Sequence, residues 1–252
     1  MIAIKSIKEA LGLFVKNKTL WTLAFILAIA YTLLTKISNP FQWLSSLLLY
    51  LYLLFLDLTL INAVGNLYSE GNINIERIQV SFKRYFLRVS ALPFVYVSFT
   101  FLFMCVALVW AGMLPEEPNG ISFYTTMVIG FFFLYLLPYS FSARFVILRD
   151  VKILKSIFET FKLYWGRVFD TIVLAFGIGI IYLGIMAINI YLPFTLLGYS
   201  SEQKLTMQLI GEISNTPVGF ILSLILTPFS TLWASSTLTV YFKKVEELGG
   251  FD

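Results

Sequence analysis

Residues 82–89 read FKRYFLRV, and residues 161–168 read FKLYWGRV. The two segments share Phe, Lys, Tyr, Arg and Val at five of eight matched positions. Residues 5–13 (KSIKEALGL) and 155–163 (KSIFETFKL) share Lys, Ser, Ile, Glu and Leu. The same alignment matches three aromatic residues, Phe14, Tyr85 and Tyr164. Self-similarity of this kind predicts three copies of one structural unit.

Apolar residues recur in each copy at steps of three or four, which is the spacing of one face of an α-helix. They are Ile4, Ile7, Leu11 and Phe14; then Ile75, Ile78, Phe82, Tyr85 and Val89; then Val151, Leu154, Phe158, Phe161 and Trp165. Lysine and arginine occupy the other faces. We therefore predict three amphipathic helices in the cytoplasmic membrane interface, with apolar side chains in the acyl boundary and basic side chains among the headgroups.

The composition between these copies predicts membrane spans. Of the 252 residues, 59% are hydrophobic and only 13% are charged. Soluble domains carry about 25% charged residues, so this chain needs the bilayer as part of its solvent. Crossing the hydrocarbon takes about 20 helical residues. Six apolar stretches are long enough, near residues 20–37, 42–66, 91–113, 121–143, 168–192 and 216–241.

Turn signals pair the six stretches into three hairpins. Breaks follow the first, third and fifth stretches, at Asn39-Pro40, at residues 115–120 and from Pro193. The sequence thus predicts an all-α integral membrane fold, formed by one domain over residues 1–252. Each unit is an amphipathic helix plus a hairpin, and the expected units cover about residues 1–66, 72–143 and 150–241, with a short tail at 242–252.

Basic residues predict the orientation. Sixteen of the 18 Lys and Arg lie in segments 1–20, 67–90, 144–168 and 243–252. Lys36 and Lys204 remain for the other side. Because basic residues in short loops stay in the cytoplasm, we expect a multi-pass protein of the cell (plasma) membrane with both termini cytoplasmic.

The pattern resembles a broad group of uncharacterised six-span membrane families of bacteria and archaea. This group includes the membrane domain fused to some glycerophosphoryl diester phosphodiesterases. The resemblance is carried by the thrice-repeated amphipathic segment and by residues 71–89 (GNINIERIQVSFKRYFLRV), 144–168 (RFVILRDVKILKSIFETFKLYWGRV) and 227–244 (TPFSTLWASSTLTVYFKK). It implies a fold but no catalytic residue, because the diesterase activity of the fused proteins lies in a separate barrel domain.

The residue types do not predict an enzyme. The chain has no histidine and one cysteine, which excludes His-based zinc sites, Ser-His-Asp or Cys-His catalytic groups and an intrachain disulfide. Glycine-rich phosphate loops and protease motifs are absent from the sequence. We therefore expect no catalysis, no cofactor, no metal and no nucleic-acid partner.

Asp57 is the acid that lies well inside an apolar stretch, in the run FLDLTLINAVGN. An ionisable group at that depth is a functional-site hypothesis by default, because placing it there costs several kcal/mol. We predict a substrate or ion site formed by Asp57, Asn62 and Asn189. Structural hydrogen bonding between helices is the alternative. Further candidate partners for Asp57 are Ser230, Thr231, Ser235, Ser236 and a snorkelling Arg144.

The basic residues of the second and third copies are candidate ligands of lipid headgroups. They are Lys83, Arg84, Arg88, Lys152, Lys155, Lys162 and Arg167. The alternative is that these segments are structural elbows and that their charges only fix the topology.

These observations favour a non-catalytic membrane protein that binds lipids, with a preference for anionic ones, or acts as a scaffold or accessory protein through its amphipathic helices. The alternative is a permease, or the membrane subunit of a transporter, that uses Asp57. That alternative requires an ATPase partner, because the chain encodes no ATPase of its own. Assembly with further copies of the chain, or with another membrane subunit, is compatible with both hypotheses.

Overall fold

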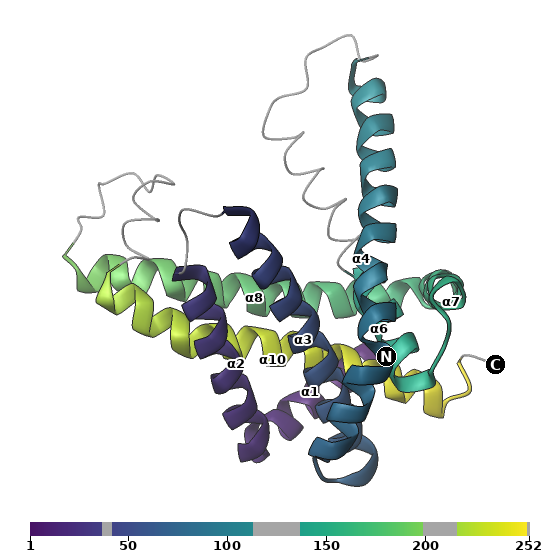
Figure 1. Cartoon of the computed structure of the whole chain (residues 1–252), viewed down its shortest axis with the longest axis horizontal. Helices are drawn as coiled ribbons and strands as arrows, with labels where there is room; N and C mark the ends of the chain where they lie inside the picture. Colours follow the sequence, from purple (N-terminus) through teal and green to yellow (C-terminus); the bar gives the residue numbers. More distant parts are fainter. Residues whose placement is uncertain (37–41, 113–136, 199–215, 251–252) are drawn as a thin grey trace.

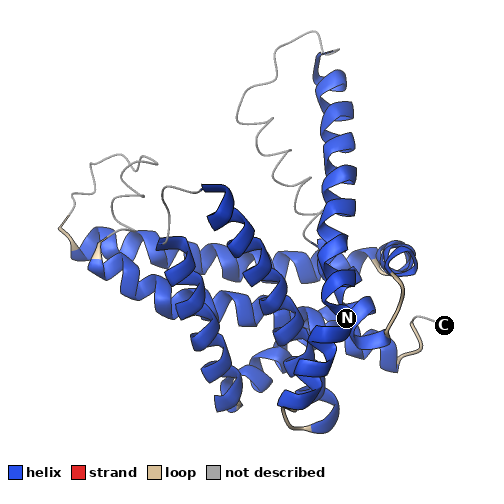
Figure 2. Ribbon diagram, viewed as in Figure 1, coloured by secondary structure: helices blue, strands red, loops and turns tan. Residues whose placement is uncertain are grey.

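The computed structural model describes residues 1–36, 42–112, 137–198 and 216–250. Within these ranges the chain is helical and contains no strand (Figure 2). The helices are α1 (Ile2–Lys16), α2 (Lys18–Lys36), α3 (Gln42–Glu70), α4 (Ile75–Gly112), α6 (Leu137–Arg149), α7 (Ile153–Gly166), α8 (Val168–Leu196) and α10 (Pro217–Glu247). The predicted all-α class is therefore confirmed.

Three helical segments are long and apolar enough to cross a membrane: Tyr50–Glu70, Ile75–Leu102 and Pro217–Glu247. Two bent helix pairs are also long and apolar enough to cross a membrane when each pair is taken as one span. The chain therefore has three to five candidate spans among its described residues. Of the six predicted stretches, the one near 121–143 lies largely outside these residues.

The two bent pairs are the first and third copies of the repeat. α1 and α2 meet at 89°, and α7 and α8 meet at 97°. The second copy differs from the prediction, because it continues without a bend into the following apolar stretch as the single helix α4 (Figure 1). Its amphipathic segment is thus the first part of a long helix and does not lie across the span as an elbow.

The local sequence explains this difference. Asn17 sits at the first bend with extended backbone angles, and its Oδ1 accepts from the amide of Leu20, 3.1 Å away, at the start of α2. The second bend follows Gly166, a weak helix former. The matching residues of the second copy are Leu87 and Arg88, both good helix formers, so the helix continues.

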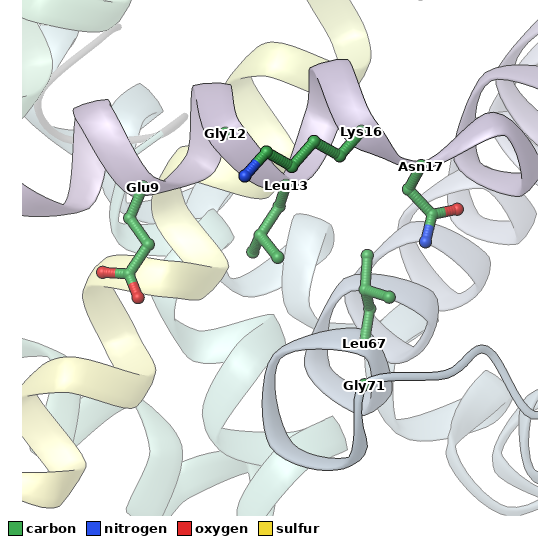
Figure 3. A pocket seen from close by; sticks show the side chains of 7 residues that line it. All are labelled: Glu9, Gly12, Leu13, Lys16, Asn17, Leu67 and Gly71. Carbon is green, nitrogen blue, oxygen red and sulfur yellow. The ribbon is translucent and has the colours of Figure 1, made fainter.

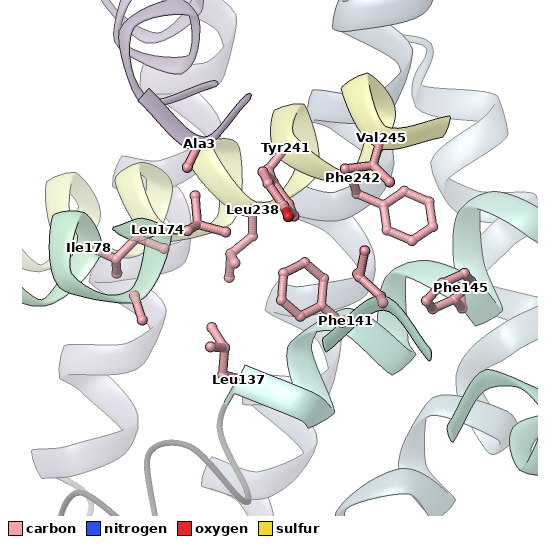
Figure 4. Packing of buried hydrophobic residues seen from close by; sticks show 12 residues of the cluster. Ala3, Leu137, Phe141, Phe145, Leu174, Ile178, Leu238, Tyr241, Phe242 and Val245 are labelled. Carbon is pink, nitrogen blue, oxygen red and sulfur yellow. The ribbon is translucent and has the colours of Figure 1, made fainter. Parts of the chain in front are cut away.

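α10 is the central element of the packing. α1, α2, α3 and α8 all pack along it, and α8 runs beside it in Figure 1. One core cluster joins α10 to α6 and α8, where the rings of Phe141 and Tyr241 lie 5.8 Å apart (Figure 4). α1 fits closely because its inward residues Ala3, Ser6 and Ala10 are small and fully buried.

Polar contacts near the end of α10 connect elements that are distant in sequence. Lys244 forms an ion pair with Glu9 of α1. Glu246 lies 3.2 Å from Arg149 of α6, and Tyr68 of α3 donates to Glu247 over 3.3 Å. Since α1, α3 and α6 all meet α10 there, these contacts fix its position relative to the three helices.

Candidate functional site

The outward face of α7 is apolar. Leu154, Phe158 and Trp165 are 71%, 72% and 81% exposed, although large apolar side chains are usually buried. They belong to the apolar stripe that the sequence predicts for the third copy. The exposed surface continues past the bend at Phe169 of α8, which is 80% exposed. An apolar surface of this extent on two adjoining helices is typical of contact with lipid or with a partner.

Lysines border this apolar face. Lys152, Lys155 and Lys162 of the predicted headgroup set are all exposed on α7 or at its start. Long basic side chains thus lie beside the exposed apolar side chains of the same helix. Three of the seven predicted headgroup ligands therefore lie on one outward surface.

Buried hydroxyl groups hold the opposite side of α7 against the protein. Ser142 Oγ of α6 lies 2.6 Å from Tyr96 Oη of α4 and 2.8 Å from Thr160 Oγ1 of α7. Ser142 also donates to the carbonyl of Ser156 over 3.3 Å. Because these groups are buried and satisfy one another, they fix the rotation of α7 and keep its apolar stripe outward.

The basic residues of the second copy are arranged differently. Arg84 and Arg88 both form ion pairs with Asp150, the first of the three residues between α6 and α7, which has a φ of 52°. Their guanidinium carbons also lie 5.5 Å and 5.9 Å from the centre of the Tyr85 ring. Lys83 is exposed. Two predicted headgroup ligands therefore bind another part of the chain instead.

The apolar face of the second copy also differs from the prediction. Tyr85 and Val89 are 7% and 0% exposed, and they pack in a core cluster with Leu58 and Ile61 of α3. The later part of this stripe therefore packs against the protein, while Ile75 at its start is 66% exposed. The reason is that α4 continues straight, which keeps its stripe against α3.

Arg167 occupies the bend between α7 and α8. Its guanidinium lies 3.9 Å from the carboxylate of Asp170. Its backbone N–H donates hydrogen bonds to the carbonyls of Leu163 and Tyr164 in the last turn of α7. A side chain in this position stabilises the bend. The structure therefore gives this predicted headgroup ligand a local structural partner.

Asp57 lies on α3 and is half-buried. Its Oδ2 accepts from Tyr139 Oη of α6 at 2.8 Å. Asn62 does not join it, since its Nδ2 donates to the carbonyl of Leu58 in its own helix at 2.6 Å. The side chain of Asn189 lies outside the described residues. Asp57 and Asn62 therefore have separate hydrogen-bond partners, and Tyr139 is a partner of Asp57 that the sequence analysis missed.

Arg144 is buried, with 3% of its surface exposed, so it does not snorkel toward water. Its Nε donates to Thr239 Oγ1 at 3.1 Å, and its Nη2 donates to the carbonyl of Ser235 at 3.0 Å. Its Nη1 donates to the carbonyl of Ser140 at 2.7 Å. Asp57 lies near enough to this guanidinium for the two groups to influence each other electrostatically. A buried guanidinium, a carboxylate and a phenol thus lie together where α3, α6 and α10 meet.

Sequence reasoning had little means of finding these partners. Tyr139 follows a run of Phe, Leu and Tyr residues, and Thr239 is one of several hydroxyl residues in α10. Neither stands out by residue type or spacing. Among the described residues, no group of three or more Cys, Asp or Glu side chains could hold a metal ion.

Comparison of the chain with protein-family models, curated proteins and solved structures found no match. Functional inference therefore rests on the chain's own residues.

Proposed function

We propose that this chain is a non-catalytic integral membrane protein that holds anionic lipids at the cytoplasmic surface of the plasma membrane through α7. The observation that carries this proposal is the outward face of α7, where exposed Leu154, Phe158 and Trp165 are bordered by Lys152, Lys155 and Lys162. The bend of 97° supports it, because α7 can lie along the surface while α8 enters the bilayer.

The energies of the two kinds of contact support the same orientation. Removing a large apolar side chain from water contributes about 1.5–3 kcal/mol. A lysine near an anionic membrane surface contributes about 1 kcal/mol. The apolar side chains would therefore set the depth of α7, and the lysines would set the preference for anionic headgroups.

Brominated phosphatidylglycerol tests the depth of α7, because bromine quenches nearby tryptophan fluorescence. In proteoliposomes, we expect this lipid to quench the tryptophan fluorescence of the native protein more strongly than that of Trp165→Phe. The variant has no tryptophan in α7. Quenching in the variant equal to that of the native protein would place Trp165 away from lipid and contradict the proposal.

Replacing Lys152, Lys155 and Lys162 together by Gln tests the headgroup preference. Loss of three charges near the surface should weaken the preference for phosphatidylglycerol over phosphatidylcholine by about tenfold or more. The matched control replaces Arg77, Arg84 and Arg88 by Gln. Arg77 forms an ion pair with Glu70, and Arg84 and Arg88 form ion pairs with Asp150. The control removes the same charge, so equal effects of both triple variants would exclude a specific role for α7.

The proposed orientation has its own test. Fusion of a fluorescent protein that folds only in the cytoplasm to the C-terminus should give a fluorescent product if that end is cytoplasmic. Fusion of an alkaline phosphatase that is active only outside should give none. The reverse result would show that α7 faces the other leaflet.

A second candidate function is a transporter subunit that works with a separate ATPase. The arrangement of Asp57, Tyr139 and Arg144 at the meeting point of α3, α6 and α10 favours it, because ionisable groups among apolar spans mark ion pathways. Gentle extraction followed by mass spectrometry of intact complexes should then recover an ATPase in fixed stoichiometry. Full complex activity in Asp57→Asn would exclude a transport role for that carboxylate.

A further inference from the structure

A groove of about 390 Å³ lies between α1 and the end of α3 (Figure 3). One side is a single helical face of α1, formed by Glu9, Gly12, Leu13 and Lys16. The other side is the last turn of α3 and the glycine that ends it, Gly71. The groove therefore lies beside the bend between α1 and α2, far along the sequence from α7.

Two glycines keep the groove open. A Cβ added at Gly12 would meet no atom within 4 Å, so the space in front of this residue is empty of protein. Gly71 has a φ of 74°, and its amide donates to the carbonyl of Leu67 at 3.0 Å, which ends α3 without a side chain over the groove. The groove is thus bounded by backbone at both points, where a larger residue would project into it.

Two polar side chains that line the groove, Lys16 and Asn17, favour an anion. Lys16 is exposed and forms no ion pair with the described residues. Asn17 uses its Oδ1 to cap α2, so its side-chain NH2 remains as a donor. Glu9 forms an ion pair with Lys244, which offsets its charge. Because Lys244 offsets Glu9, the ammonium of Lys16 is the uncompensated charge of the groove.

The apolar part of the groove fits the remainder of a lipid. Leu13 of α1 and Leu67 of α3 line it, beside Lys16 and Asn17 (Figure 3). The adjoining α1–α2 pair passes the length and hydropathy test for a membrane span. A ligand that joins a phosphate to an apolar chain matches both kinds of side chain, whereas a soluble anion would use only the polar ones.

We propose that this groove binds the phosphate of a phospholipid headgroup, with Lys16 and the Asn17 amide as donors and Leu13 and Leu67 against the start of the acyl chains. The site is separate from the α7 face, in another copy of the repeat. The proposal of a lipid site in the groove can therefore be correct or wrong independently of the proposed function of α7.

Filling the groove tests the proposal without disturbing the fold. Gly12→Leu places a side chain in empty space and replaces a poor helix former by a good one. Phosphatidylglycerol titrated into the full chain in mild detergent is counted by native mass spectrometry, and the variant should lose one tightly held lipid. Gly179→Leu is the matched control, because a Cβ at Gly179 of α8 also meets no atom within 4 Å. Retention of that lipid by Gly12→Leu would overturn the proposal.

A second experiment removes the positive charge of Lys16. Lys16→Gln should weaken binding of that lipid about fivefold, the effect of one basic group near an anionic headgroup. Lys8→Gln is the control, because Lys8 is also exposed on α1 but does not line the groove. Equal weakening by both variants would show only a general charge effect and would contradict a site at Lys16.

A third arm distinguishes the lipid from a soluble phosphate compound. Glycerol 3-phosphate added in excess should leave the bound phosphatidylglycerol in place, because it makes no contact with Leu13 and Leu67. Displacement of the lipid by glycerol 3-phosphate, in the native protein but not in Gly12→Leu, would assign the groove to a soluble anion and overturn the lipid proposal. The α7 triple-lysine variant should keep the groove-bound lipid.

Discussion

At the residue scale, Arg144 is the side chain whose surroundings differ most from its expected ones. A long basic side chain near a span end often snorkels to water. Here the guanidinium instead donates to Ser140, Ser235 and Thr239 inside the protein. A buried charge of this kind is tolerated because hydrogen bonds surround it, and removing the side chain breaks those bonds, while Asp57 keeps the hydrogen bond from Tyr139.

Arg144→Ala should therefore lower the free energy of unfolding by about 3–5 kcal/mol, the cost of breaking a buried charged group out of its network. Arg77→Ala is the comparison, since Arg77 pairs with Glu70 on the surface and should cost about 0–1 kcal/mol. Thermal unfolding in mild detergent, followed by tryptophan fluorescence, measures both. Equal stability of the two variants would mean that the Arg144 network is not structural.

At the element scale, the three copies share a sequence pattern but not a geometry. The first and third bend sharply before the next helix, and the second continues straight as α4. Matched serines of the bent copies are nevertheless used alike. Ser6 on α1 and Ser156 on α7 are both fully buried on the inward face. A small residue there lets each helix lie close to its neighbours.

Ser6→Leu should destabilise the protein by about 1–3 kcal/mol, because the larger side chain overfills the contact between α1 and α10. Ser6→Ala should have a much smaller effect, since Ser6 Oγ bonds only to the carbonyl of Ile2 in its own helix. Unfolding temperatures of the two variants give the comparison. If alanine proves as harmful as leucine, the hydroxyl group matters and not its size.

At the scale of the whole molecule, the first and last helices lie together. α1 packs along α10, and Glu9 and Lys244 form an ion pair across this contact. The two ends of the chain therefore stabilise each other, although more than 200 residues separate them in sequence.

Exchanging these charges tests that contact. Glu9→Lys alone should lower the unfolding temperature, because it places two like charges together, with a cost of about 1 kcal/mol for a partly exposed pair. The double variant Glu9→Lys with Lys244→Glu should recover most of the loss. Additive losses in the double variant would show that the ion pair contributes nothing to stability.

Composition and periodicity alone determined the helical class, the apolar stretches and the existence of amphipathic segments, because these depend on residue type and on spacing along one helix. Spacing also grouped Leu154, Phe158 and Trp165 on one face of α7, and all three are exposed in the structure. It could not say that the same kind of stripe on α4 packs against α3, since a helical period is the same whether its apolar face meets lipid or protein. Only the tertiary structure decided that, together with the burial of Arg144, the pairing of Arg84 and Arg88 with Asp150, and the groove at Lys16, because each of these depends on side chains that folding brings together from distant parts of the chain.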